Sequence, residues 1–152
     1  MQKTRKMATE RSPVLVVGGA GFIGSHTVEA LLARGCRVRV LDDLSSGKLS
    51  NLPQRSAALE VVIGDVRDAP TVKRAMRGMR GCIHLAAQVS AARAVEDPQG
   101  SALRNILGFI NVIEALRAQE VPRLVYASSA AVYGDSQNLP LDEDEALRPT
   151  NP

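Results

Sequence analysis

The sequence predicts an α/β fold of the Rossmann type, with a doubly wound parallel sheet and helices on both of its faces. Short apolar runs alternate along the chain with longer segments of helical period. The first run, Val14 to Val17, is apolar at every position, which is typical of a strand buried on both faces. It leads directly into a glycine-rich turn and then a helix. This order is that of a right-handed βαβ unit, the building block of a parallel sheet.

The other elements continue the same alternation. Further strands are expected at Arg37 to Leu41, at residues 59–65, at residues 82–87 and from Arg123 onward, so the sheet is truncated after about five strands. Helices are expected from Phe22 to about Arg34, from Pro70 to Arg77, and from Glu96 to Pro122. The last of these carries apolar residues at helical spacing: Leu103, Ile106, Leu107, Ile110 and Ile113. The polar, proline-punctuated segment 135–152 predicts a surface loop.

Composition sets the domain plan and excludes several classes of protein. The 152 residues, 45% hydrophobic, suit one domain at 13–152 behind a basic tail at 1–12. The net charge of +3 arises in that tail, so we expect no nucleic-acid partner. No apolar run is long enough to span a membrane, and no secretory signal is present. Cys36 and Cys82 have no metal-binding spacing and predict reduced thiols in a cytoplasmic protein.

The glycine-rich turn predicts a phosphate-binding loop. Gly18, Gly21 and Gly24 stand between the buried strand and the start of the helix. In a dinucleotide-binding loop one glycine permits the tight turn, the next admits a pyrophosphate, and the last permits close packing of helix on strand. A Walker A loop is the alternative, but Ser25 and His26 stand where Lys-Ser/Thr is required.

An acidic residue at the end of the second strand supports a dinucleotide. Asp42 follows Gly21 by 21 residues, close to the spacing at which a carboxylate accepts hydrogen bonds from the adenosine ribose. A carboxylate there repels a 2′-phosphate, so Asp42 favours NAD over NADP. A solvated turn is the alternative for the Asp42-Asp43 pair, and Asp43 is expected to be a turn residue.

Five motifs in order resemble a known superfamily over residues 13–152: "GGAGFIGSH", "DDLSSGK", "GDVRD", "HLAAQVS" and "YASSAAVYG". The sequence is similar to the extended short-chain dehydrogenase/reductases, and within them to the NAD-dependent nucleotide-sugar epimerase/dehydratase family, the UDP-glucose 4-epimerases above all. The resemblance implies that the cofactor is NAD. The residues implied to bind it are Gly18, Gly21, Phe22, Ile23, Gly24, Asp42, Asp43, Leu44, Ser45, Ser46, Gly47, Asp65, Val66, Leu85, Ala86 and Ala87.

Within that set the resemblance implies separate contacts. The backbone N–H groups of Phe22 and Ile23 meet the pyrophosphate, and the loop 42–47 wraps the ribose. Asp65 meets the adenine together with the Val66 backbone, although a plain helix cap by Asp65 or Asp68 is the alternative for this motif.

Two further polar residues need a role. His84 stands alone in an apolar strand and is expected to be a core residue whose polar atoms are satisfied. Asn105 resembles an Asn of the family's long helix, whose side chain hydrogen-bonds to backbone groups or water near the fourth strand.

The catalytic residue that the resemblance implies is Ser129, which would hold the sugar C4 hydroxyl. Ser128 is its competitor, with a backbone role at the end of the fifth strand as its alternative. Ala130 and Ala131 stand where the 4,6-dehydratases carry Asp-Glu, which favours epimerase over dehydratase. The family's Tyr-x-x-x-Lys pair is absent, because neither Tyr126 nor Tyr133 has Lys four positions later.

The function predicted is that of an NAD-dependent nucleotide-sugar epimerase, with hydride transfer at sugar C4 through a 4-keto intermediate. The expected substrate is a UDP-sugar, and the expected parent enzyme is a homodimer that uses the long helix in its interface. The chain is expected to be an N-terminal fragment, inactive alone. The alternatives are a non-catalytic NAD-binding short protein and a dehydratase, reductase or decarboxylase of the same superfamily.

Overall fold

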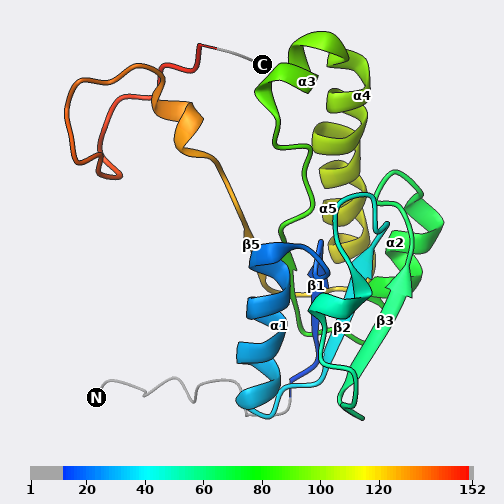
Figure 1. Cartoon of the computed structure of the whole chain (residues 1–152). Helices are drawn as coiled ribbons and strands as arrows, with labels where there is room; N and C mark the ends of the chain where they lie inside the picture. The colour runs from blue at the N-terminus through cyan, green and yellow to red at the C-terminus, as the bar shows by residue number, and fades with distance from the viewer. Residues whose placement is uncertain (1–11, 151–152) are drawn as a thin grey trace, which may run out of the picture.

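The computed structural model describes residues 12–150, so residues 1–11 of the predicted basic tail lie outside the described residues. Five strands form one parallel sheet in the order β3-β2-β1-β4-β5. They are β1 (Val14–Val17), β2 (Val38–Asp42), β3 (Leu59–Ile63), β4 (Gly81–His84) and β5 (Leu124–Tyr126). The chain order reverses at β1, as Figure 1 shows, and this confirms the predicted doubly wound sheet.

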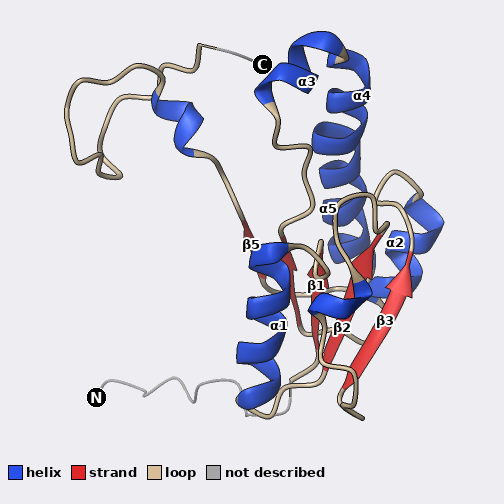
Figure 2. Ribbon diagram, in the orientation of Figure 1, coloured by secondary structure: helices blue, strands red, loops and turns tan. Residues whose placement is uncertain are grey.

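Helices cover both faces of the sheet (Figure 2). On one face, Val28 of α1 (Phe22–Ala33) packs with Val16 of β1 in the same buried cluster. On the other face, α2 (Ala69–Met76) and α5 (Gly108–Ala118) pack over Leu15 and Val17. Successive side chains of a strand point to opposite faces, so a strand covered on both sides must be apolar throughout. All three of these β1 side chains are fully buried, as the sequence predicts.

Strand boundaries differ slightly from the expected ones, and three of the differences bear on the site. β2 begins and ends one residue later than predicted, so Asp42 is its last residue and pairs with Ile63. β3 ends at Ile63 rather than at residue 65, which leaves Gly64 and Asp65 beyond the strand. β4 ends at His84, which leaves residues 85–87 in a loop beyond the strand. All three differences put site residues at the carboxyl edge of the sheet.

The predicted helix from Glu96 to Pro122 is confirmed in its main part. The chain is helical without a break from Pro98 to Ala118, through α4 (Pro98–Ala102), a π-helical turn η2 (Leu103–Leu107) and α5. A short helix that the sequence did not predict, α3 (Ala91–Glu96), precedes it and is separated from it at Asp97, because the residue before a proline avoids the helical conformation. The apolar stripe of this region is exposed, whereas Gly108, Val112, Ala115 and Leu116 form the buried face. Through that face α5 packs against α2 and shares a buried cluster with Leu15 and Val17 of β1.

β5 is a short edge strand, as expected for a sheet truncated at this point. Its residues Val125 and Tyr126 are 63% and 57% exposed. The chain then leaves the sheet through a short helix, η3 (Ala130–Tyr133), and Figure 1 shows the following segment extending away from the strands. Among the described residues after Tyr133 there are only turns and irregular structure, which confirms the predicted loop.

Candidate cofactor site

A pocket opens at the carboxyl ends of β1, β2, β3 and β4, where the order of the sheet reverses. This is the place at which open α/β sheets bind ligands. It brings together eleven of the predicted cofactor residues, and its lining is Gly18, Gly21, Leu41, Asp42, Asp43, Ser45, Ser46, Gly64, Asp65, Val66, Leu85, Ala86, Ala87 and Arg104.

The glycines after β1 are required for different reasons. Gly18 has a positive φ of 80°, and a Cβ there would stand 2.6 Å from the Ala86 nitrogen. A Cβ on Gly24 would collide with the Gly18 carbonyl oxygen, which fits its expected role in packing the helix against the turn. A Cβ on Gly21 would meet only that same oxygen, at an ordinary 3.4 Å, among the described residues. Since Gly21 lines the pocket, the space in front of it is free for a ligand rather than filled by the protein.

At the N-terminus of α1, no side chain caps the free backbone N–H groups. Its cap residue is Gly21, which has no side chain to accept a hydrogen bond, and its first turn contains no acidic residue. The N–H groups of Phe22 and Ile23 lie in this first turn, where an α-helix offers no internal acceptor. The helix dipole adds partial positive charge at the same place, so the turn suits a pyrophosphate. The side chains of Phe22 and Ile23 are exposed and do not line the pocket.

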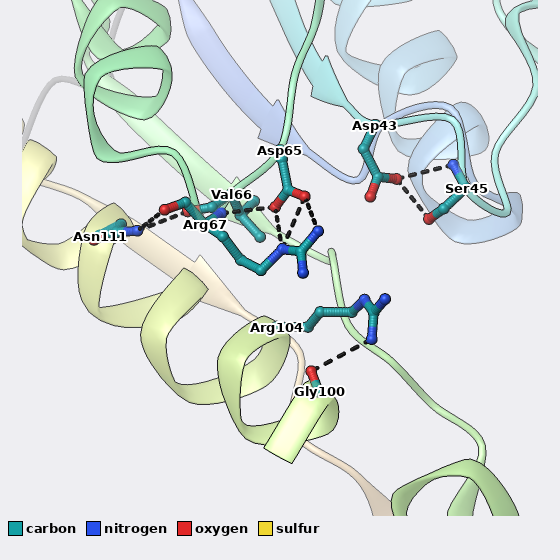
Figure 3. A network of polar contacts seen from close by, with 8 residues as sticks. All are labelled: Asp43, Ser45, Asp65, Val66, Arg67, Gly100, Arg104 and Asn111. Atoms are coloured by element: carbon teal, nitrogen blue, oxygen red, sulfur yellow. Dashed lines mark hydrogen bonds and ion pairs between the residues drawn. The ribbon is translucent and has the colours of Figure 1, made fainter. Parts of the chain in front are cut away.

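Asp42 braces the glycine loop as well as lining the pocket. One carboxylate oxygen accepts a hydrogen bond from the Ala20 N–H at 2.9 Å, and the other accepts one from the Leu44 N–H at 2.9 Å. A carboxylate has about four acceptor positions, so both oxygens keep capacity for ribose hydroxyls. Asp43 is exposed and accepts hydrogen bonds from the backbone and hydroxyl of Ser45 (Figure 3), which is the expected turn role.

Two residues of the loop 42–47, Leu44 and Gly47, determine its backbone conformation. Leu44 has a positive φ of 59°, an uncommon conformation for a residue with a side chain. Gly47 is buried against Ala20, and a Cβ on it would lie 2.8 Å from the Ala20 carbonyl carbon. Neither Leu44 nor Gly47 lines the pocket, so both act by shaping the loop that carries Ser45 and Ser46.

Asp65 and Arg67 form an ion pair at the pocket mouth. The Arg67 guanidinium donates two hydrogen bonds to one Asp65 oxygen, at 2.5 and 2.9 Å, and a third to the other at 3.0 Å. This pairing lowers the pKa of Asp65 and raises the pKa of Arg67. Asp65 therefore does not cap α2, and the N-cap residue Asp68 accepts from the Thr71 hydroxyl instead of a backbone N–H.

The loop after β4 is held by Asn105. Its amide accepts a hydrogen bond from the Gln88 N–H at 2.7 Å and donates one to the Gln88 carbonyl at 3.0 Å. This agrees with the backbone role that the resemblance implies for Asn105. Because Gln88 follows Ala87 directly, the pair fixes the small residues that line the pocket.

The two candidate catalytic serines and His84 are not part of the pocket lining. Ser129 is exposed, and its hydroxyl accepts a hydrogen bond from the Ala131 N–H at 3.1 Å as the cap of η3. Ser128 is also exposed. His84 is buried as expected, but its Nδ1 has no hydrogen-bond partner among the described residues, so the expectation of a satisfied imidazole is wrong. The ring instead lies against Phe109, 5.4 Å between centroids.

Three lining residues were not predicted: Leu41, Gly64 and Arg104. Gly64 follows β3 directly, so the "GD" ending of that strand carried a usable signal. Arg104 carried none, because it lies in the π-helical turn and reaches the pocket only through the packing of distant segments.

Among known protein families, the model of the NAD dependent epimerase/dehydratase family matches residues 14–152. The chain belongs to this family. The family is NAD-dependent, which agrees with the predicted cofactor.

Individual relatives carry epimerase names. The chain is 42% identical to the UDP-glucose 4-epimerase of Mycolicibacterium smegmatis, over 91% of this chain and 45% of that protein. It is 38% identical to the putative UDP-glucose 4-epimerase of Methanocaldococcus jannaschii, with the same coverage of 91% and 45%. The chain thus spans less than half the length of the curated relatives it matches.

Solved structures of 4-epimerases also superpose on this chain. The UDP-glucose 4-epimerase of Thermus thermophilus, in complex with NAD, superposes with a TM-score of 0.84 at 43% identity, over 91% of this chain and 45% of that one. The UDP-N-acetylglucosamine 4-epimerase of Methanobrevibacter ruminantium superposes with a TM-score of 0.87 at 33% identity, over 94% and 46%. No helix among residues 12–150 is long and apolar enough to cross a membrane.

Proposed function

We propose that this chain is the NAD-binding part of a nucleotide-sugar epimerase that acts on a UDP-sugar. The observation that carries the proposal is Gly21, which lines the pocket although a Cβ on it would meet no described protein atom closer than 3.4 Å. Around this position lie the free first turn of α1 and the carboxylate of Asp42. Together they offer donors to a pyrophosphate and acceptors to a ribose, which is the donor set of a dinucleotide without a 2′-phosphate.

The reaction proposed is epimerisation at sugar C4. NAD, when bound, would supply a hydride acceptor and then a hydride donor for the sugar C4, with a 4-keto sugar between the two transfers. Ser129 would hold the C4 hydroxyl, and its exposed side chain is accessible to a sugar. Ala130 and Ala131 supply no acid or base at the positions where a dehydratase needs them to eliminate water. This favours epimerase over dehydratase.

General-base catalysis is absent from the residues of this chain. In the family a tyrosine phenolate, with its pKa lowered by a nearby lysine, removes the hydroxyl proton, and such a base contributes about 10²–10⁴-fold in rate. Neither Tyr126 nor Tyr133 is followed by Lys at the fourth position. We therefore expect the 152-residue chain to bind NAD without interconverting sugars. A non-catalytic NAD-binding protein is the second candidate.

The exposed stripe of the long helical segment fits the proposed dimer. Leu103, Ile106, Leu107, Ile110 and Ile113 lie on η2 and α5 and are all exposed. An apolar stripe of this kind on a helix is typical of an interface. We propose that it pairs with the same stripe of a second copy.

Two measurements test the function. Calorimetry with NAD and NADP on this chain should show binding of NAD and much weaker binding of NADP. The gene's full-length product should interconvert UDP-glucose and UDP-galactose, or their N-acetyl forms, without added NAD. No NAD binding would contradict the cofactor assignment. NAD binding without turnover of any of the four sugars would favour the reductase, the dehydratase or the non-catalytic candidate.

A further inference from the structure

Arg104 lines the pocket, although nothing in the sequence pattern marks it as a cofactor residue. We propose that its guanidinium covers the face of the adenine ring and so clamps the adenosine half of the cofactor. The inference rests on the proposed NAD binding and assigns a role to one more residue of the same pocket. Its basis is the placement of Arg104, the charges around it, and the shape of the group it can present.

Packing of the helix sets the position of Arg104. Gly108 lies against Val66, since a Cβ on it would come within 2.6 Å of a Val66 methyl group. The Asn111 amide donates hydrogen bonds to the carbonyls of Val66 and Arg67, at 2.9 and 3.1 Å (Figure 3). Arg104 lines the pocket together with Val66, on which Gly108 packs, so Arg104 lies on the side of the helical segment that carries Gly108 and Asn111. That face is docked on the Asp65–Arg67 turn, where the adenine is expected.

The two arginines at the pocket mouth differ in their partners. Arg67 is committed to the Asp65 carboxylate by its hydrogen bonds. Among the described residues, Arg104 has one hydrogen bond, a long one of 3.4 Å to the Gly100 carbonyl. Figure 3 shows its side chain extending from the helix with no partner among the carboxylates drawn. The Arg104 guanidinium is therefore available to a ligand, and Arg67 is not.

The chemistry of the group selects a planar base over a phosphate. A guanidinium is planar, weakly hydrated, and stacks on aromatic faces, including those of nucleic-acid bases. The pyrophosphate is expected at Gly21 and the start of α1, on the β1 side of the pocket, whereas Arg104 faces the turn after β3. Val66 lines the same end of the pocket and offers an apolar surface to the ring. These features suit the adenine face.

Calorimetry on the chain tests this role with three substitutions. Arg104→Met keeps the length of the side chain without its plane, and Arg104→Lys keeps the charge without the plane. Arg117→Met is the matched control, because Arg117 lies on α5, is paired with Glu114 and is far from the pocket lining. Base stacking of about 1–3 kcal/mol predicts that both Arg104 substitutions weaken NAD binding by about 5- to 150-fold. ADP-ribose, which keeps the adenine and lacks nicotinamide, should lose the same factor.

Several outcomes would overturn the clamp. One is an NAD affinity of Arg104→Met equal to that of the wild type. Another is wild-type NAD affinity in Arg104→Lys, which would make Arg104 a charge partner of a phosphate. A loss seen with NAD and absent with ADP-ribose would place Arg104 away from the adenine. If the wild-type chain itself fails to bind NAD, the proposed function fails first, and that result is distinct from all of these.

Discussion

Gly21 and Gly24 lie three residues apart in one loop, yet they serve different purposes. Gly24 is needed by the fold, because the Gly18 carbonyl occupies the place of its Cβ. Gly21 is not needed in that way: its φ of −73° is open to any residue and its Cβ site is uncrowded. A glycine that the fold does not require, lining a pocket, indicates that a ligand approaches its backbone.

Alanine substitution should separate these two purposes. Gly21→Ala should leave the midpoint of thermal unfolding nearly unchanged and weaken NAD binding by about 10-fold or more, because the methyl group occupies ligand space. Gly24→Ala should lower the free energy of unfolding by about 1–3 kcal/mol through overpacking. Calorimetry and urea unfolding measure the two effects. Equal NAD affinity in wild type and Gly21→Ala would remove the main support for the assignment of this turn as a phosphate-binding loop.

Asp42 should affect both binding and stability. Asp42→Ala removes the acceptor of the Ala20 N–H, and Ala20 is fully buried. An unsatisfied buried donor costs about 1–3 kcal/mol, so the free energy of unfolding should fall by that amount and NAD affinity should fall as well. Asp142→Ala is the control, since Asp142 is exposed, its carboxylate accepts a hydrogen bond from the Asp144 N–H within its own turn, and it is not part of the pocket lining. A variant Asp42→Ala with wild-type NAD affinity would contradict the ribose assignment.

The elements differ in how far the sequence determines them. β1, the glycine turn and α1 follow from local signals: an all-apolar run, the glycine spacing, and Gly35 with its positive φ of 77° after the helix. The region after β4 follows only in part, because the long helix is expected whereas α3 before Pro98 and the π-helical turn inside the long helix are not. Arg104 reaches the pocket only through the packing of Gly108 on Val66, which lie 42 residues apart. No local pattern encodes such a contact.

β4 contains a titratable group with consequences for stability. His84 is 6% exposed and lies against Phe109, which in turn contacts Tyr126. Burial lowers the pKa of His84 from 6.5 to about 4. The folded chain therefore binds fewer protons than the unfolded chain between these values. The contribution of His84 to the free energy of unfolding is fully present above pH 6.5. It should be lost as the pH drops toward 4, by up to about 1.4 kcal/mol per pH unit.

Urea unfolding at several pH values between 4.5 and 8, each of them about half a unit apart, checks this slope. His84→Phe should flatten it, because an uncharged ring of similar shape can occupy the site beside Phe109. An unchanged slope in His84→Phe would assign the pH dependence to other groups.

Two of the exposed apolar surfaces of the described chain make different assemblies possible. One is the stripe on η2 and α5, where Ile106 and Ile110 are 61% and 47% exposed. The other is the open edge of β5 at Val125 and Tyr126. A helix stripe can meet its own copy about a two-fold axis and form a closed dimer, whereas an open strand edge is a template for further strands. The stripe is therefore the surface on which a defined dimer of this chain would form.

Sedimentation velocity should show a dimer whose stability depends on the stripe. The double variant Ile106→Glu, Ile110→Glu should be monomeric at concentrations where the wild type is dimeric, because dimerisation would bury four carboxylates without partners. Ile63→Glu is the matched control, as it places the same charge on an exposed apolar residue of β3, at the other edge of the sheet. Val125→Lys tests the β5 edge. A dimer that survives the double variant and dissociates in Val125→Lys would mean that copies pair through strand edges, and the proposed helix interface would be wrong.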